Sequence, residues 1–366
     1  MANKATTRFA ALMITHQCNL HCTYCYEVYK KAQTMSVEMA KRYIRRVFDQ
    51  VVSSPVKYEA IEFSFMGGEP LLEFNIIQEL CEWTWQQEWP VDYYFFASTN
   101  GTLLDDSTKQ WLKKHRQQFI LGLSLDGTMQ MQLVNRGELA TRIDIDFFRS
   151  VWPQQSIKAT VSPHTLPFLA QGIIHLHEIG FSSINANLAY GIEWTNDHLS
   201  IYKEQLIKLV NYYVEHPDKE RCSLLSMDIT SIIDLTHNYA KFCGCGVGTT
   251  LYDIDGHEYP CAVFSPITMP ESLLKRLPEI DFTDDAAFLM DACKPCILHR
   301  ACPRCYGTNF LHRNNPASQD PFLCNAFKLQ VLANCLLTEY RLSNGMVDGE
   351  DGLSIQNALN ILQTVL

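Results

Sequence analysis

The chain has 366 residues, 47% of them hydrophobic, and a formal net charge of −10. This is enough apolar material for one large core and a smaller appended domain. The acidity argues against a surface for nucleic acid or anionic membranes, and no stretch is long and apolar enough to span a bilayer. Fourteen cysteines without an N-terminal signal segment indicate a reducing, cytoplasmic location and metal ligation rather than a disulfide scaffold.

Short apolar segments alternate with amphipathic ones along the chain. The predicted strands are Phe9–Ile14, Ala60–Phe65, Tyr93–Ala97, Phe119–Leu125, Ile157–Val161 and Ser183–Leu188. The predicted helices are 37–52 with Ser36 as N-cap, Leu71–Gln87, Asp106–His115, Ile145–Trp152, Leu166–Ile179, His198–Val214, Phe322–Tyr340 and Leu353–Leu366. The alternation predicts parallel βα units, in a partial barrel or an open sheet, with the chemistry at the carboxyl ends of the strands.

Three cysteines follow the first predicted strand at the spacing C-x3-C-x2-C: Cys18, Cys22 and Cys25. Three thiolates can hold three irons of a 4Fe–4S cube and leave the fourth iron open to a substrate. A zinc knuckle or a disulfide is the alternative, and His16 or His21 could supply a fourth zinc ligand. Neither histidine completes a usual zinc spacing, so we interpret this loop as an iron–sulfur site.

This cysteine loop, with Tyr24 before its last cysteine, resembles that of the radical S-adenosylmethionine (SAM) family. In that family SAM chelates the open iron, and one electron from the reduced cluster breaks SAM to a 5′-deoxyadenosyl radical. The radical then removes a hydrogen atom from the substrate, while the protein supplies positioning and excludes water. The resemblance implies a partial (β/α)6 barrel of the TIM type.

The segment FSFMGGEP (63–70) resembles the part of this family that binds the SAM amine. Gly67 and Gly68 let the backbone approach a ligand closely, Glu69 can accept a hydrogen bond from an amine, and Pro70 suits the first turn of a helix. Taken alone, the segment also matches an ordinary strand-to-helix turn.

Three later strand ends resemble the other SAM-binding segments of the family. The resemblance implies Ser98, Thr99 and Asn100 for the ribose, Ser124 and Arg136 for the carboxylate, and Asn187 and Leu188 for the adenine. Alternatively, the first segment is a plain turn and Leu188 is a simple core residue.

A second cysteine-rich region carries CGxG, DGxxYPC, C-x2-C-x5-C and a later single cysteine. This pattern resembles the SPASM domain, which holds two auxiliary 4Fe–4S clusters, although two structural zinc sites are an alternative. The last gap of the motif, Pro303 and Arg304, is one residue shorter than is usual in the family. The resemblance implies Cys243, Cys245, Cys261 and Cys305 for one cluster, with Cys243 as the fourth ligand, and Cys293, Cys296, Cys302 and Cys324 for the other.

The expected reaction is oxidation of a ribosomally made peptide to an intrapeptide carbon–carbon, ether or thioether crosslink. Formylglycine formation in a sulfatase is an alternative, but Ala262 replaces the proposed basic Asp of the YPCD segment in sulfatase maturases. Epimerisation would need a hydrogen donor such as Cys222, and a catalytically silent, metal-stabilised scaffold that binds peptides is the non-enzyme alternative. The candidates for the general base are Asp253, Asp255, His257 and Glu193, residue types that are more often solvated or in turns.

The expected partners are a precursor peptide with its leader and a reductant such as flavodoxin or ferredoxin. Because only 17 residues precede Cys18, we expect no fused leader-binding domain, and a separate protein could serve. Cys81 and Cys335 match no cluster spacing and read as apolar helix residues. The predicted domains are 1–220 for the partial barrel, 221–242 for a linker, 243–345 for the SPASM domain and 346–366 for a helical tail.

Overall fold

The computed structural model describes residues 6–233, 241, 243–347 and 349–363. They form two compact units, each taken by itself below. The first unit draws its described residues from within 1–124, 136–155 and 243–284. The second unit draws them from within 125–135, 156–242 and 285–366.

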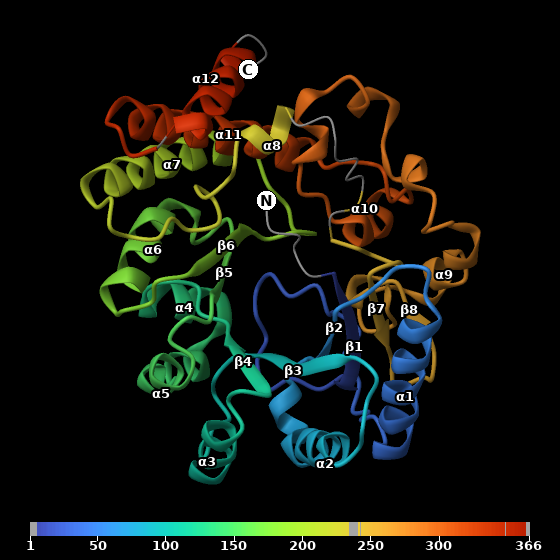
Figure 1. The fold of residues 1–366 in the computed structure, drawn as a ribbon. Coiled ribbons are helices and arrows are strands. Elements are labelled where there is room, and N and C mark those ends of the chain that lie inside the picture. Colours follow the sequence, from blue (N-terminus) through green and yellow to red (C-terminus); the bar gives the residue numbers. More distant parts are fainter. Residues whose placement is uncertain (1–5, 234–240, 242, 348, 364–366) are drawn as a thin grey trace. The chain divides into compact units, whose positions relative to one another are not determined.

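The first unit is built on a six-stranded sheet with the strand order β4-β3-β2-β1-β7-β8. Strands β1 to β4 and β7 are paired in parallel, and β8 returns antiparallel to β7 (Figure 1). The pairing of β7 beside β1 brings a segment some 240 residues downstream next to the first strand. The strands are β1 (Thr7–Thr15), β2 (Ala60–Gly67), β3 (Asp92–Thr99), β4 (Phe119–Leu123), β7 (Thr249–Tyr252) and β8 (Glu258–Tyr259).

Helices α1 and α2 cover one face of this sheet (Figure 1). The Ser36 hydroxyl accepts a hydrogen bond from the Met39 amide, which confirms the predicted N-cap. Short helices complete the unit. They are α1 (Val37–Ser53), η1 (Pro70–Glu73), α2 (Phe74–Trp85), α3 (Asp106–Lys114), η2 (Glu138–Thr141), α5 (Ile145–Val151), η4 (Ala262–Phe264), α9 (Glu271–Leu274) and η5 (Leu277–Glu279).

Aromatic rings fill the space between this sheet and its helices. Phe63 of β2 lies in register with Ala10 of β1 and Phe95 of β3, and its ring contacts that of Phe48 from α1. The opposite face carries a smaller apolar cluster of Ala11, Met13, Leu251, Ala262 and Ile267. The strand ends are therefore held between two packed faces, which fixes the loops that follow them.

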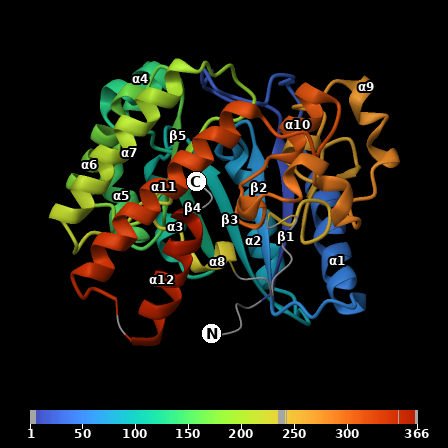
Figure 2. The same cartoon turned by 90° about the horizontal axis from the view of Figure 1, so that it is seen from above.

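The second unit contains a parallel pair of strands and most of the long helices. Helices α7 and α11 lie side by side (Figure 2), and a core that includes Ile232, Leu298, Phe327, Val331 and Leu359 joins α8, η8, α11 and α12. The elements are β5 (Ile157–Val161), η3 (Leu166–Phe168), α6 (Leu169–Glu178), β6 (Ile184–Leu188), α7 (Asp197–Glu215), α8 (Thr230–Ile233), η6 (Asp285–Phe288), η7 (Asp291–Cys293), η8 (Ile297–Arg300), α10 (Tyr306–Arg313), α11 (Pro321–Ser343) and α12 (Gly349–Gln363). Helix α4 (Met129–Arg136) spans the division between the units.

The structure confirms the α/β class and the alternating order of the predicted elements. The six predicted strands divide between two sheets, four in the first unit and two in the second. The helices predicted from Leu71 and Leu166 each open with a 3-10 turn, where a proline sits at the first or second position. The strand predicted to end at Leu125 ends at Leu123.

The last predicted helix extends further toward the N-terminus than expected, beginning at Gly349. Its expected end at 364–366 lies outside the described residues, as do 234–240 and 242 of the predicted linker. Within the part of the chain that the structure describes, no helix combines the length and apolarity needed to cross a membrane.

Candidate functional site: strand ends around a cysteine loop

Cys18, Cys22 and Cys25 are half-buried in the loop that follows β1. Hydrogen-bond donors lie beside two of the sulfurs, with the Leu20 amide 3.4 Å from Cys18 Sγ and Lys30 Nζ 3.4 Å from Cys25 Sγ. Burial raises the pKa of the Cys18 thiol, while the Leu20 amide and the Lys30 charge oppose that rise. Donors aimed at sulfur stabilise thiolate, the form that ligates metal.

The two glycines of GGEP pack against the start of this cysteine loop. A Cβ on Gly67 would lie 2.4 Å from the Thr15 carbonyl oxygen, and one on Gly68 would lie 2.4 Å from that of Gln17 and 2.7 Å from Cys18 Cβ. The Glu69 amide donates to the Gln17 carbonyl at 2.8 Å. Close approach is thus required here by the chain itself, and it anchors the residues that lead into Cys18.

Glu69 is buried and joins the ends of β2 and β3. Its carboxylate accepts hydrogen bonds from the Thr99 hydroxyl at 2.8 Å, the Asn100 amide at 2.8 Å and the Leu71 amide at 3.1 Å. Burial raises the pKa of Glu69, opposed by these three bonds and by the charge of Arg136. Pro70 follows as the first residue of η1, as the sequence predicted.

An amide network ties the cysteine loop to the residues after β3. Asn100 Nδ2 donates to Asn19 Oδ1 at 2.9 Å, and Asn19 Nδ2 donates to the Thr102 hydroxyl at 2.8 Å. That hydroxyl donates in turn to Asn100 Oδ1 at 2.6 Å. Asn19 and Thr102 were not among the residues that the sequence pointed to, although each adjoins one of its motifs.

The remaining predicted SAM contacts of the first unit lie at the same edge. Ser98 and Ser124 are within 3.4 Å of each other through their hydroxyls, and the Ser124 amide donates to the Thr99 carbonyl. The buried Arg136 guanidinium lies over the Tyr24 ring, 5.4 Å from its centroid. Arg136 thus meets the cysteine loop through an aromatic face.

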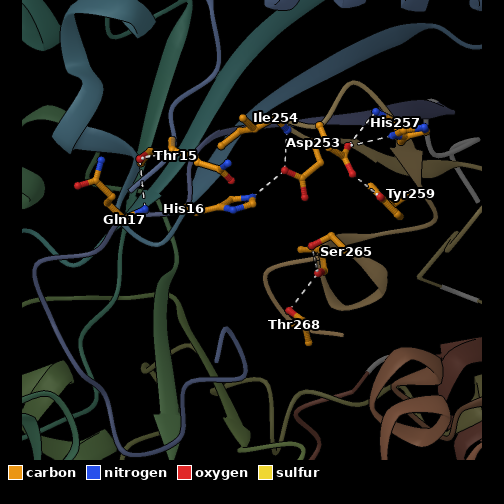
Figure 3. Close-up of polar contacts among 12 residues, drawn as sticks. Thr15, His16, Gln17, Asp253, Ile254, His257, Tyr259, Ser265 and Thr268 are labelled. Carbon is orange, nitrogen blue, oxygen red and sulfur yellow. Dashed lines mark hydrogen bonds and ion pairs between the residues drawn. The ribbon is translucent and has the colours of Figure 1, made fainter. Parts of the chain in front are cut away.

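Asp253, one of the candidate bases, pairs with His16 at the carboxyl ends of β7 and β1 (Figure 3). His16 Nε2 lies 2.7 Å from Asp253 Oδ1, and both side chains are almost fully buried. His16 Nδ1 and Asp253 Oδ2 have no hydrogen-bond partner among the described residues. The pair joins the β7 segment to the chain two residues before Cys18.

The other candidate bases are in different settings. Asp255 and His257 occupy the exposed turn between β7 and β8, where Asp255 accepts hydrogen bonds from the His257 amide and the Tyr259 hydroxyl (Figure 3). Glu193 is exposed in the second unit and lines a cavity of about 360 Å³ there.

Asn187 and Leu188, the predicted adenine contacts, lie on β6 of the second unit. They line a cavity of about 380 Å³ together with Ser223 and Phe327. Cys222, the conceivable hydrogen donor for an epimerase, is fully buried, and burial raises the pKa of its thiol. Cys81 is also fully buried, whereas Cys335 is half-buried.

The later cysteines fall into two groups. In the first unit, the Cys245 thiol is hydrogen-bonded to both Cys243 and Cys261, and these bonds together with burial raise its pKa. In the second unit, Cys293, Cys296, Cys302 and Cys324 line one small pocket. Cys305 is also in the second unit, directly before α10. Among the described residues, no group of three or more His, Cys, Asp or Glu side chains has an arrangement that could hold a single metal ion.

Comparisons with known proteins give these sites a context. A family model described as a 4Fe-4S single cluster domain matches residues 7–140. The radical SAM cyclopropyl synthase TigE of Paramaledivibacter caminithermalis is 29% identical over 124 residues, covering 30% of this chain and 25% of TigE. The antilisterial bacteriocin subtilosin biosynthesis protein AlbA of Bacillus subtilis is 24% identical over 268 residues, covering 70% of this chain and 55% of AlbA.

The fold has a counterpart among solved structures. The structure of anSMEcpe with bound AdoMet and the Cp18Cys peptide superposes with a TM-score of 0.66 at 20% sequence identity. The match covers 97% of this chain and 99% of that one. The α/β fold, the cysteine loop and the relatives together indicate an enzyme. More narrowly, the chain is similar to radical SAM enzymes and, over residues 7–140, to a 4Fe-4S single cluster domain.

Proposed function

We propose that this chain is a radical SAM enzyme that acts on a ribosomally made precursor peptide and forms an oxidative crosslink within it. The observation that carries the proposal is the cysteine loop held at the carboxyl edge of the sheet, with Glu69, Asn100 and Arg136 around it. Three half-buried thiols with donors beside them suit three irons of a 4Fe–4S cluster. When bound, the cluster and SAM together supply a radical able to remove a hydrogen atom from a C–H bond.

In this proposal the residues of the strand ends hold SAM and keep water away. Glu69 already accepts three hydrogen bonds, which fix β2 against β3, and its carboxylate has one acceptor site left for the SAM amine. Ser98, Thr99 and Asn100 would face the ribose, while Ser124 and Arg136 would face the carboxylate. Asn187 and Leu188 are proposed for the adenine.

The peptide as substrate class is supported by the relatives. AlbA is named for bacteriocin biosynthesis, and anSMEcpe was solved with a bound peptide. The chain covers about half of AlbA and a quarter of TigE. For this chain, therefore, both the crosslink and its type, a carbon–carbon, ether or thioether bond, are proposals. Ala262 carries no group that could take a proton, which disfavours the formylglycine alternative.

The proposal also includes two further iron–sulfur clusters. We assign the later cysteines to two auxiliary clusters in a SPASM domain, following a partial barrel, with the boundaries expected from the sequence. Contact among Cys243, Cys245 and Cys261 and the shared pocket of Cys293, Cys296, Cys302 and Cys324 support this grouping. A precursor leader, a separate leader-binding protein and a flavodoxin or ferredoxin reductant remain proposed partners.

The test is the mass of a peptide. The enzyme is co-expressed anaerobically with the short open reading frames that flank its gene, and intact mass and fragmentation are recorded. Loss of two hydrogens with fragmentation blocked between two residues is the expected result. Loss of two hydrogens confined to one serine would replace the crosslink with formylglycine. Unchanged mass of every candidate, with 5′-deoxyadenosine accumulating, would contradict crosslinking of those peptides.

A further inference from the structure

One small pocket of the second unit is lined by four thiols and a buried arginine. Cys293 ends η7, Cys296 precedes η8, Cys302 follows it, and Cys324 lies in the first turn of α11. Leu298 and Phe327 add apolar side chains to the lining, and His299, Gln319 and Lys328 also take part in it. Short turns and one long helix thus converge on a pocket in which four thiols lie beside the Arg304 guanidinium.

Arg304 is only 5% exposed, yet its guanidinium is largely unpaired. Nη2 donates to the His299 carbonyl, but Nε and Nη1 have no hydrogen-bond partner among the described residues. Arginine stays protonated in proteins, so this is a buried positive charge, and two of its three nitrogens have no acceptor among the described residues. Such a group is costly, because burying a charge without a counter-charge loses its hydration.

The four thiols line the same pocket as the Arg304 guanidinium, whose Nε and Nη1 have no hydrogen-bond partner among the described residues. A guanidinium attracts thiolate, the form of cysteine that ligates metal. The arrangement has a reason if the pocket holds a group with net negative charge and sulfur acceptors, which is the character of a cluster bound by four thiolates.

We infer that Arg304 is the counter-charge of the cluster proposed for Cys293, Cys296, Cys302 and Cys324, and that it raises the reduction potential of that cluster. Net charge and hydrogen bonds to sulfur are established controls of iron–sulfur potentials, and the reduced state, with one more negative charge, gains more from a nearby cation. The inference rests on the proposed cluster but not on any substrate. Arg304 is one of the two residues in the shortened gap between Cys302 and Cys305, so the feature belongs to this chain's own departure from the motif.

The test is a redox titration of the full-length protein, reconstituted anaerobically and followed by electron paramagnetic resonance. Cys18, Cys22 and Cys25 are replaced by Ala throughout to remove the proposed radical cluster. Adding Cys293→Ala and Cys296→Ala to this background identifies the signal of the proposed four-cysteine cluster, because that signal should then disappear. The titration follows this signal. Arg304→Gln should lower its equilibrium constant for reduction at least tenfold, a negative shift of about 59 mV for a one-electron couple.

Two further variants separate charge from shape. Lys328 lines the same pocket but is exposed, so Lys328→Gln removes a cation that water screens and should shift the potential far less than Arg304→Gln. Arg304→Lys keeps the charge and should restore at least half of the shift. If Arg304→Gln takes up no iron while Arg304→Lys does, the counter-charge role is supported. Loss of iron in both would mean a structural role and overturn it.

The failure of this inference differs from the failure of the proposed cluster. If Cys293→Ala/Cys296→Ala retains the full iron content and every signal, no cluster sits at these cysteines and the role of Arg304 falls with it. If iron is lost there but Arg304→Gln and Lys328→Gln shift the potential equally, the cluster stands and Arg304 does not tune it.

Discussion

The cysteine loop after β1 and the four-cysteine pocket of the second unit hold their thiols in different ways. The loop is half-buried, receives a backbone amide and a lysine as donors, and is pinned to strand ends by Gly68, Glu69 and Asn100. The pocket is formed by short turns and α11, and a buried guanidinium, two of whose nitrogens have no hydrogen-bond partner among the described residues, lines it together with the exposed Lys328. The three thiols of the loop lie among polar strand ends that could also hold SAM. The pocket offers four thiols, enough to ligate every iron of a 4Fe–4S cluster. The contrast fits the open, SAM-binding cluster proposed for the loop and the cluster with four thiolate ligands proposed for the pocket.

The largest expected effect is the loss of SAM cleavage when the cysteines of the loop, rather than those of the pocket, are replaced. Replacing Cys18, Cys22 and Cys25 by Ala should reduce 5′-deoxyadenosine formation to background and leave the auxiliary iron in place, because the three thiols of this loop lie beside the proposed SAM site. Iron analysis and chromatography of the reaction under a chemical reductant measure both quantities. The matched control is Cys293→Ala/Cys296→Ala, which should lose iron but still cleave SAM. Continued formation of 5′-deoxyadenosine by the triple variant would refute the assignment of the open cluster.

The next effect tests how the cysteine loop is anchored. Gly68→Ala would place a methyl group 2.4 Å from the Gln17 carbonyl oxygen and 2.7 Å from Cys18 Cβ, so the backbone before the first cysteine must move. Overpacking of this kind costs about 1–3 kcal/mol, and we expect the loop to lose its iron as well. Gly248→Ala is the control, since its nearest neighbour would be 3.9 Å away. Equal thermal stability and iron content for the two variants would show that the close approach is unimportant.

A smaller effect is expected at the buried pair of His16 and Asp253. Asp253→Ala leaves the His16 ring without its partner, which should lower the free energy of unfolding by about 1–3 kcal/mol. Asp253→Asn keeps an oxygen that can accept from Nε2 and should recover part of the loss. Denaturant unfolding monitored by circular dichroism measures the stability of both. An unchanged midpoint for Asp253→Ala would show that the pair does not secure the loop.

The sequence predicted the local features of the first unit well, because strand ends, N-caps and helix starts depend on neighbouring residues. Ser36 caps α1 and Pro70 opens η1, as their positions implied. Gly67 and Gly68 were predicted to let the backbone approach a ligand, and the structure shows that both also pack closely against the chain itself, which their spacing in the sequence does not reveal.

Features that join distant segments were missed. The four residues of β7 are too short to show a period, and their place beside β1 depends on packing across the sheet. The hydrogen bonds of Asn19 with Asn100 and Thr102, the pairing of His16 with Asp253, and the burial of Arg304 are three-dimensional facts of the same kind. From a sequence alone, charged and amide side chains are expected at the surface, so their burial becomes known only from the structure.

The smallest expected effect separates a structural role from a binding role at the edge of the loop's site. Ser98 and Ser124 share one long hydroxyl contact, so Ser98→Ala should change stability by no more than about 0.5 kcal/mol. If the Ser98 hydroxyl faces the SAM ribose, loss of that bond, worth about 0.5–1.5 kcal/mol, should raise the KM for SAM by roughly two- to tenfold. Ser150→Ala removes an equally local hydroxyl from α5 and is the control. Because the two variants are matched in size and in stability cost, a KM change confined to Ser98→Ala assigns the hydroxyl to the ligand, whereas equal KM values would remove Ser98 from the proposed site.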